Sequence, residues 1–139
     1  MANWEELTWR VSDATYAAWC AHDPDAVAAV FAEDARTRDA GTETWEIGRA
    51  AVRDRAAVLL AGFSDFRLER QILVIEGARH ADRWIMTGTH DGELLGVEAT
   101  GNAVRVEGGT FTLLDEAGLV AEDVHFVDYA SLFRQLGVG

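Results

Sequence analysis

The hydrophobic pattern changes its period about halfway along the chain, and this change limits the folds that the chain can adopt. In the first half, apolar residues such as Trp4, Leu7 and Val11 recur at steps of three and four, which is typical of amphipathic helices. From about residue 66 onward, runs rich in strand-forming residues alternate with glycine-containing turns. Helices followed by strands predict an α+β protein with an antiparallel sheet.

The element order predicts the shape of the fold in more detail. We expect three N-terminal helices over about 3–22, 24–31 and 48–60, with a short strand and a loop over 36–46. Strands are expected over about 66–75, 83–90, 103–114 and 119–128, and a short helix over 130–136. Gly108 and Gly109 predict a bulge or bend. Long, bent strands with helices on one face predict a cone-shaped, curved antiparallel or mixed barrel that encloses a hydrophobic cavity.

Length, charge and cysteine content exclude several classes of function. The 139 residues correspond to one domain, 1–139. The formal charge of −12 argues against binding to nucleic acids or to anionic membrane surfaces. Cys20 is the single cysteine, and no Cys/His cluster has the spacing of a metal site, so we expect no metal. The N-terminus lacks the pattern of a signal peptide, and the expected location is the cytoplasm.

Two strands each carry an apolar face that ends in an ionisable side chain. Side chains alternate across a strand, so one face of the 83–90 strand carries Trp84, Met86, Gly88 and His90. The corresponding face of the last strand carries Val120, Glu122, Val124, Phe126 and Asp128. If both faces line one cavity, Asp128 and His90 lie near each other within it.

A carboxyl group in an apolar cavity has a raised pKa and exchanges protons near neutral pH. A nearby imidazole can stabilise a developing oxyanion or hold the acid in place. Asp128 and His90 are therefore the candidate catalytic residues for removing a proton next to a carbonyl, without a metal or an organic cofactor. The candidate substrate-binding residues are Tyr16, Trp19, Asp39, Trp45, Trp84, Met86 and Phe126.

Structural alternatives stay open for each of these residues. Asp128 precedes a predicted helix and could serve only as its N-cap. His90 lies in a turn-forming run and could be a surface residue. His125 falls on the opposite set of the last strand, which we expect to face outward, and His80 is expected to be solvated.

Several sequence runs resemble the SnoaL-like polyketide cyclases. These are WIMTGTHDGELLG (84–96), ATGN (99–102), the DEAG turn (115–118), HFVD (125–128) and LFRQLG (132–137). The resemblance covers about residues 16–137. It implies the cone-shaped fold of the nuclear transport factor 2-like superfamily and a cofactor-independent aldol condensation that closes a ring of a polyketide. By motif, it assigns the acid–base role to Asp128 and the neighbouring imidazole to His90, and it implies a homodimer formed through the open sheet face.

Other functions are compatible with the same sequence. The cavity could hold a small hydrophobic ligand without turnover, or the protein could be an isomerase or a hydrolase of the same superfamily, because a fold does not fix a function. The surroundings of Asp128 distinguish these readings, since an enzyme needs this carboxyl group within the cavity. The sequence does not specify the substrate or the stereochemistry.

Overall fold

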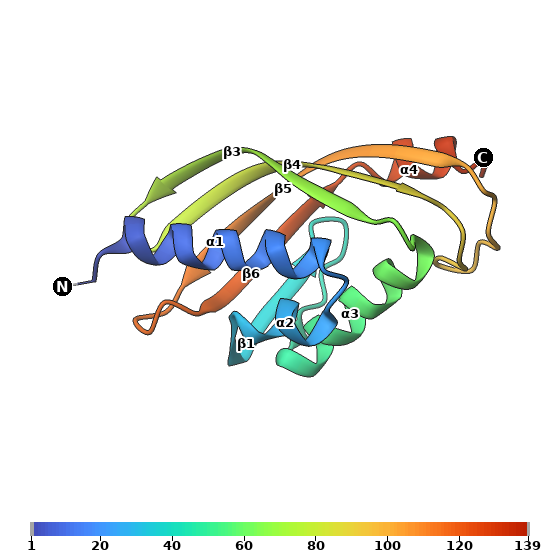
Figure 1. The fold of residues 1–139 in the computed structure, drawn as a ribbon. Helices are drawn as coiled ribbons and strands as arrows, with labels where there is room; N and C mark the ends of the chain where they lie inside the picture. The colour runs from blue at the N-terminus through green and yellow to red at the C-terminus, as the bar shows by residue number, and fades with distance from the viewer. Residues whose placement is uncertain (1, 139) are drawn as a thin grey trace.

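The computed structural model describes residues 2–138 and shows a curved sheet packed against helices (Figure 1). The helices are α1 (Trp4–Cys20), α2 (Pro24–Ala29), α3 (Arg49–Gly62) and α4 (Tyr129–Gln135). The strands are β1 (Phe31–Asp39), β2 (Glu46–Ile47), β3 (Arg67–Glu76), β4 (Arg79–Thr89), β5 (Ala103–Leu114) and β6 (Val120–Val127). The expected α+β architecture is therefore confirmed.

The sheet is mixed, with the strand order β2-β1-β6-β5-β4-β3. β1 pairs with β6 in parallel, and the other neighbouring strands pair antiparallel. The long strands β3, β4 and β5 arch over α1, so the concave face of the sheet looks onto the helices (Figure 1). This curvature creates the space in which a cavity can form.

Two details of the expected strands are wrong. The first strand begins at Phe31 rather than near residue 36, because α2 ends at Ala29 after less than two turns. Gly108 and Gly109 pair in unbroken register with β4 and β6, so of the two predicted alternatives, a bulge or a bend, the bulge is wrong. Gly108 is needed for another reason: a Cβ atom at this position would lie 2.3 Å from the indole of Trp84.

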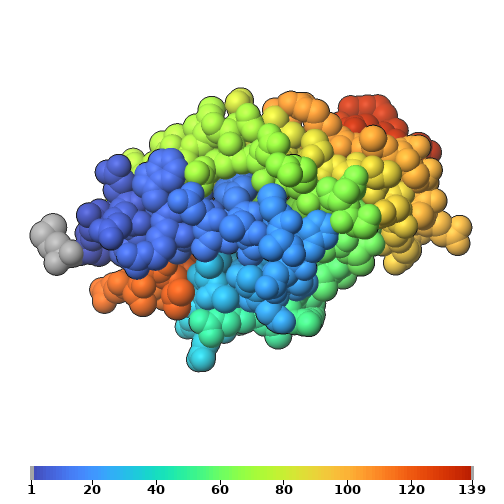
Figure 2. All heavy atoms as spheres, in the orientation of Figure 1, coloured from blue at the N-terminus to red at the C-terminus, as the bar shows by residue number. Residues whose placement is uncertain are grey.

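Helix α1 is fixed against the sheet at both of its ends. The side chain of Asn3 accepts a hydrogen bond from the backbone N–H of Glu6 and caps the helix. Near this end, the turn between β5 and β6 packs on Leu7 through Gly118, whose φ of 81° favours glycine. Figure 2 shows α1 in blue between β3 in green and this turn in orange.

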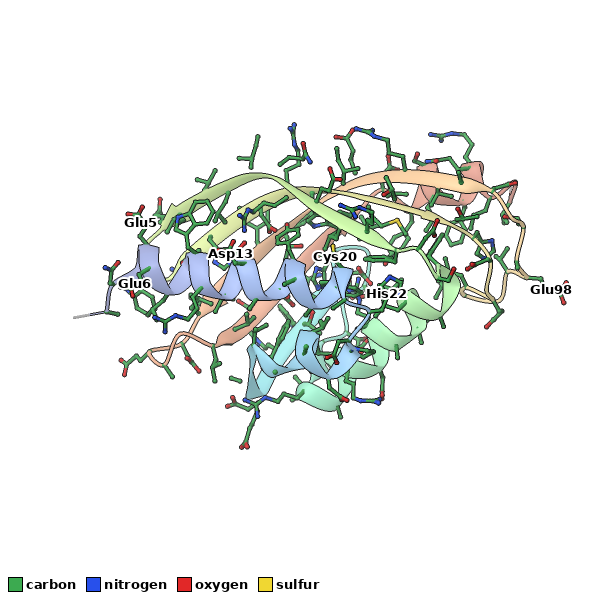
Figure 3. All side chains as sticks on the ribbon, in the orientation of Figure 1. Glu5, Glu6, Asp13, Cys20, His22 and Glu98 are labelled. Atoms are coloured by element: carbon green, nitrogen blue, oxygen red, sulfur yellow. The ribbon has the colours of Figure 1, made fainter. Side chains whose placement is uncertain are left out.

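Polar contacts hold the other end of α1 beside the start of β3, where Figure 3 labels Cys20 and His22. The thiol of Cys20 donates to the carbonyl oxygen of Leu68 at 3.4 Å. Nε2 of His22 lies 3.0 Å from the carbonyl oxygen of Phe66. Helix α1 is thus held at both ends beside the concave face of the sheet.

The convex face of the sheet carries a continuous apolar strip. In the ladder, Val74 pairs with Ala81, Ala81 with Phe111 and Phe111 with Val124. Phe111 and Phe126 pack edge-to-face with their ring centroids 5.5 Å apart, and both are about half exposed.

Among the described residues, no helix is long and apolar enough to cross a lipid bilayer.

Candidate active site

A cavity of about 130 Å³ lies between the concave face of the sheet and the helices. Aromatic and aliphatic side chains form most of its wall, including those of Trp19, Phe63, Trp84 and Met86. This volume is of the order that holds one small ring compound. The cavity is therefore suited to a compact, mainly apolar molecule.

A band of polar side chains crosses the sheet at one wall of this cavity. Asp82 on β4 pairs with Thr110 on β5, which pairs with His125 on β6. In the next row, His80 pairs with Thr112, which pairs with Asp123. All six residues line the cavity. The sheet thus presents several ionisable groups to the inside of an otherwise apolar space.

A bulge in β6 determines which of its side chains face this cavity. Leu113 pairs with Glu122 and Leu114 pairs with Val120, so Ala121 is an extra residue in β6. The extra residue reverses the alternation, and Asp123, His125 and Val127 point inward after Val120. The expected face was therefore wrong beyond Val120: Phe126 points outward and is 49% exposed.

Asp123 is the most strongly perturbed carboxyl group in the cavity wall. It is 4% exposed, and burial raises its pKa to about 7. A hydrogen bond from Thr37 and the positive charge of Arg55 lower this pKa, whereas the charges of Asp82 and Asp39 raise it. Oδ1 of Asp123 has no hydrogen-bond partner among the described residues. This carboxyl group can therefore bind or release a proton near neutral pH.

His125 lies beside Asp123 on the same face of β6. Nε2 of His125 is 3.4 Å from Oδ1 of Asp123 and 3.2 Å from Oγ1 of Thr37. Nδ1 is 3.1 Å from Oγ1 of Thr110. Burial, assisted by the charge of Arg55, lowers the pKa of His125 well below its usual value, so the imidazole is neutral at neutral pH.

A second polar group faces the cavity from α1 and β4. The hydroxyl of Tyr16 donates a hydrogen bond to Oδ2 of Asp82. Burial is the main cause that raises the pKa of both groups. Arg70 stands behind them, and its Nη1 donates to the hydroxyl of Ser12 at 2.7 Å. The cavity therefore holds two separate polar centres, one at Asp123 and one at Tyr16 and Asp82.

Arg55 on α3 adds a cation to the cavity wall near Asp123. Its Nη2 donates to Oδ1 of Asp39 at 2.8 Å. Tyr129, which also lines the cavity, has its pKa raised by burial and interacts with both Arg55 and Asp39. Asp39 is thus tied to Arg55 and does not itself line the cavity.

The structure does not bring Asp128 and His90 together in the cavity, and the expectation that they face it is wrong. Asp128 is exposed and caps α4, where Oδ1 accepts from the N–H of Ser131 at 3.0 Å. His90 is fully buried behind Phe63, with the two ring centroids 5.7 Å apart. Phe63 lines the cavity and ends it before it reaches His90, whose Nδ1 accepts from the N–H of Thr100 at 3.2 Å.

The predicted substrate-binding residues divide into two groups. Tyr16, Trp19, Trp84 and Met86 line the cavity. Asp39, Trp45 and Phe126 do not. The indole of Trp45 lies instead between the guanidinium groups of Arg36 and Arg38, at 4.4 and 4.9 Å from its ring centroid.

The sequence analysis missed several ionisable residues that line the cavity, although it included Tyr16. Asp123 and His125 were placed on the outward set, and His80, which is only 7% exposed, was expected in solvent. One signal was available: the two β6 residues have the i, i+2 spacing that puts both on the same strand face. Within residues 2–138, no group of three or more His, Cys, Asp or Glu side chains is arranged to hold a metal ion.

Comparisons with known proteins agree with this architecture. A proposed SnoaL-like polyketide cyclase from Jannaschia sp. CCS1 superposes with a TM-score of 0.88 at 20% identity, covering 100% of this chain and 97% of that one. TsrD from Streptomyces laurentii superposes with a TM-score of 0.87 at 23% identity, covering 100% of this chain and 99% of TsrD. IdmH, a proposed polyketide cyclase from Streptomyces antibioticus, superposes with a TM-score of 0.80 at 23% identity, covering 94% of this chain and 98% of IdmH.

These identities support a shared fold. No curated protein sequence matches the chain. The family model described as SnoaL-like polyketide cyclase matches residues 10–136, which is most of the chain. The protein belongs to the SnoaL-like polyketide cyclase family.

Proposed function

We propose that the protein is a cofactor-independent acid–base enzyme that closes a ring in a small polyketide-like ketone or ester. The observation that carries this proposal is the buried carboxyl group of Asp123, whose pKa of about 7 lets it act as a base and then as an acid. It stands in an apolar cavity and takes the role that the sequence analysis gave to Asp128. His125, at 3.4 Å, takes the place of His90.

The reaction follows from this arrangement. The Asp123 carboxylate removes a proton from the carbon next to a substrate carbonyl, and the C–H electron pair forms an enolate. The enolate carbon attacks a second carbonyl of the same molecule, forming a C–C bond and an alkoxide. Asp123 then returns its proton to the alkoxide, so the enzyme ends in its starting state.

The polar group at Tyr16 and Asp82 suits the binding of a substrate oxygen away from the reacting carbon. Neighbouring strands lie about 4.8 Å apart, and Asp82 and His125 stand on either side of β5, so two strand spacings separate their backbones by about 10 Å. The side chains fill part of this distance, and one ring of a substrate would span the space that remains between the two polar groups. Trp84 and Met86 would cover its apolar surface.

A Kemp elimination tests this function without knowledge of the substrate. In this reaction a base removes the ring C–H of nitrobenzisoxazole, the N–O bond breaks, and a coloured cyanophenolate forms. We expect the wild-type protein to catalyse it and Asp123→Asn to lose about 100-fold or more of the rate, as for removal of a general base. Asp128→Asn is the matched control and should keep the wild-type rate.

The opposite result would contradict the assignment. If Asp123→Asn keeps the rate and Asp128→Asn loses it, the acid–base group is the helix-capping carboxyl group and not the buried one. If the wild-type protein binds the probe without turnover, the cavity is a binding site and the enzymatic proposal fails.

We also propose that the protein forms a homodimer through the convex face of the sheet. A dimer interface of this kind needs an exposed apolar surface. The convex face offers one in the row Val74, Ala81, Phe111 and Val124, together with Phe126. Sedimentation of the wild-type protein should give a dimer, and Phe111→Asp should give a monomer. A wild-type monomer at high concentration would refute this proposal.

A further inference from the structure

A chain of polar contacts runs across the cavity wall from Trp84 to Asp123. The indole Nε1–H of Trp84 lies 3.1 Å from Oγ1 of Thr110. The same hydroxyl lies 3.1 Å from Nδ1 of His125. On the other side of the ring, Nε2 lies 3.2 Å from Oγ1 of Thr37 and 3.4 Å from Oδ1 of Asp123.

The chemistry of the first group fixes the first bond of the chain and favours one direction for the rest. An indole N–H can only donate, so the oxygen of Thr110 must accept from Trp84. The single hydrogen of the Thr110 hydroxyl is then available for Nδ1 of His125. A neutral imidazole has one N–H, so a ring that accepts at Nδ1 carries its hydrogen on Nε2.

The far end of the chain is consistent with this direction. The Nε2–H of His125 donates toward Oγ1 of Thr37, which leaves the hydroxyl hydrogen of Thr37 free for the Asp123 carboxyl group. That hydrogen bond lowers the pKa of Asp123 and therefore favours the carboxylate, the form that accepts a proton. Each hydroxyl in the chain accepts one hydrogen bond and donates one.

The backbone is built to hold this chain in place. Thr110 and His125 are directly opposite each other in the β5–β6 ladder, and Trp84 lies opposite Gly108 in the β4–β5 ladder. Because Gly108 has no side chain, the indole has room beside its backbone and reaches Thr110. Trp84 is 9% and Thr110 8% exposed, so water competes little for these contacts.

We propose that Thr110, oriented by Trp84, is a positioning residue that fixes His125 as the Nε2–H tautomer, with this hydrogen directed toward Thr37 and Asp123. In this role His125 donates to Thr37 and leaves the Thr37 hydroxyl hydrogen for the Asp123 carboxylate, so His125 is not itself the base. The tautomer depends on the structure alone, whereas its effect on the rate rests on the proposed function.

The tautomer can be read directly from the two imidazole nitrogens by long-range ¹H–¹⁵N NMR. In the wild-type protein we expect the His125 spectrum to show a protonated Nε2 and an unprotonated Nδ1. Thr110→Val, which cannot donate, should give averaged signals from a mixture of tautomers, and Thr110→Ser should restore the wild-type pattern. Thr112→Val is the matched control for the spectrum only, because Thr112 is a buried residue on the same strand face that makes no contact in this chain.

Rates of Kemp elimination measured on the same variants separate the two proposals. We expect Thr110→Val to lower the rate about 2- to 10-fold, the effect of one hydrogen bond, with recovery in Thr110→Ser. A wild-type His125 that carries its hydrogen on Nδ1, or a Thr110→Val spectrum identical to the wild type, would overturn the positioning role. If the wild-type spectrum is as expected but Asp123→Asn has no effect on the rate, the proposed function fails while the tautomer assignment stands.

Discussion

The inner face of β6 and the junction between β6 and α4 each carry an aspartate, and their surroundings could hardly differ more. Asp123 points into the cavity, is 4% exposed and has a pKa raised to about 7 by burial. Asp128 is exposed and accepts a hydrogen bond from the first turn of α4. The same side chain is thus a proton-exchanging group in one place and a helix cap in the other.

The difference between them comes from the backbone and not from the residue type. The bulge at Ala121 turns Asp123 inward, whereas the end of β6 leaves Asp128 at a helix N-terminus. A carboxylate at a helix N-terminus is stabilised by the backbone N–H groups and stays in contact with water. A carboxyl group in an apolar wall has no such solvent, and its charged form becomes costly.

The largest expected effect on stability is the pH dependence caused by Asp123. Its folded pKa of about 7 lies above the ordinary value of 3.8, so the native state keeps a proton that the unfolded state has released. The contribution of Asp123 to the free energy of unfolding is therefore fully present below about pH 4 and is lost as the pH rises through about 7. Asp123→Asn removes this loss and should exceed the wild type by about 4 kcal/mol above pH 7, measured by denaturant unfolding.

The comparison is sharpened by running Asp128→Ala through the same unfolding experiment. Loss of this N-cap should cost about 1 kcal/mol, and the cost should be nearly the same on both sides of pH 7. The gap between Asp123→Asn and the wild type should close toward pH 4. A gap that is independent of pH would mean that Asp123 ionises normally in the folded protein.

The fold was predictable because it rests on repeated local signals. Asn3, the Asp23–Pro24 pair and the turn at 115–118 mark the ends of elements, and the periodic apolar residues show which type of element lies between them. These signals act within a few residues of each other, so one sequence is sufficient to read them.

The cavity wall was only partly predictable because it depends on contacts between distant segments. The correct face of β4 was found, since Trp84 and Met86 follow an unbroken alternation. The inward face of β6 was predicted incorrectly because of a single bulged residue, which no local sequence pattern indicates. Phe63 ends the cavity before His90, and this contact joins the end of α3 to the end of β4.

The most direct test of this account is the pKa of the Asp123 carboxyl group in the folded protein. Its side-chain ¹³C signal can be followed through a pH titration, with Asp123→Asn identifying the resonance. We predict a midpoint near 7 for this signal. A midpoint near 4 for Asp123 would show that its charged form is not costly in the cavity, and would contradict its role as the acid–base group.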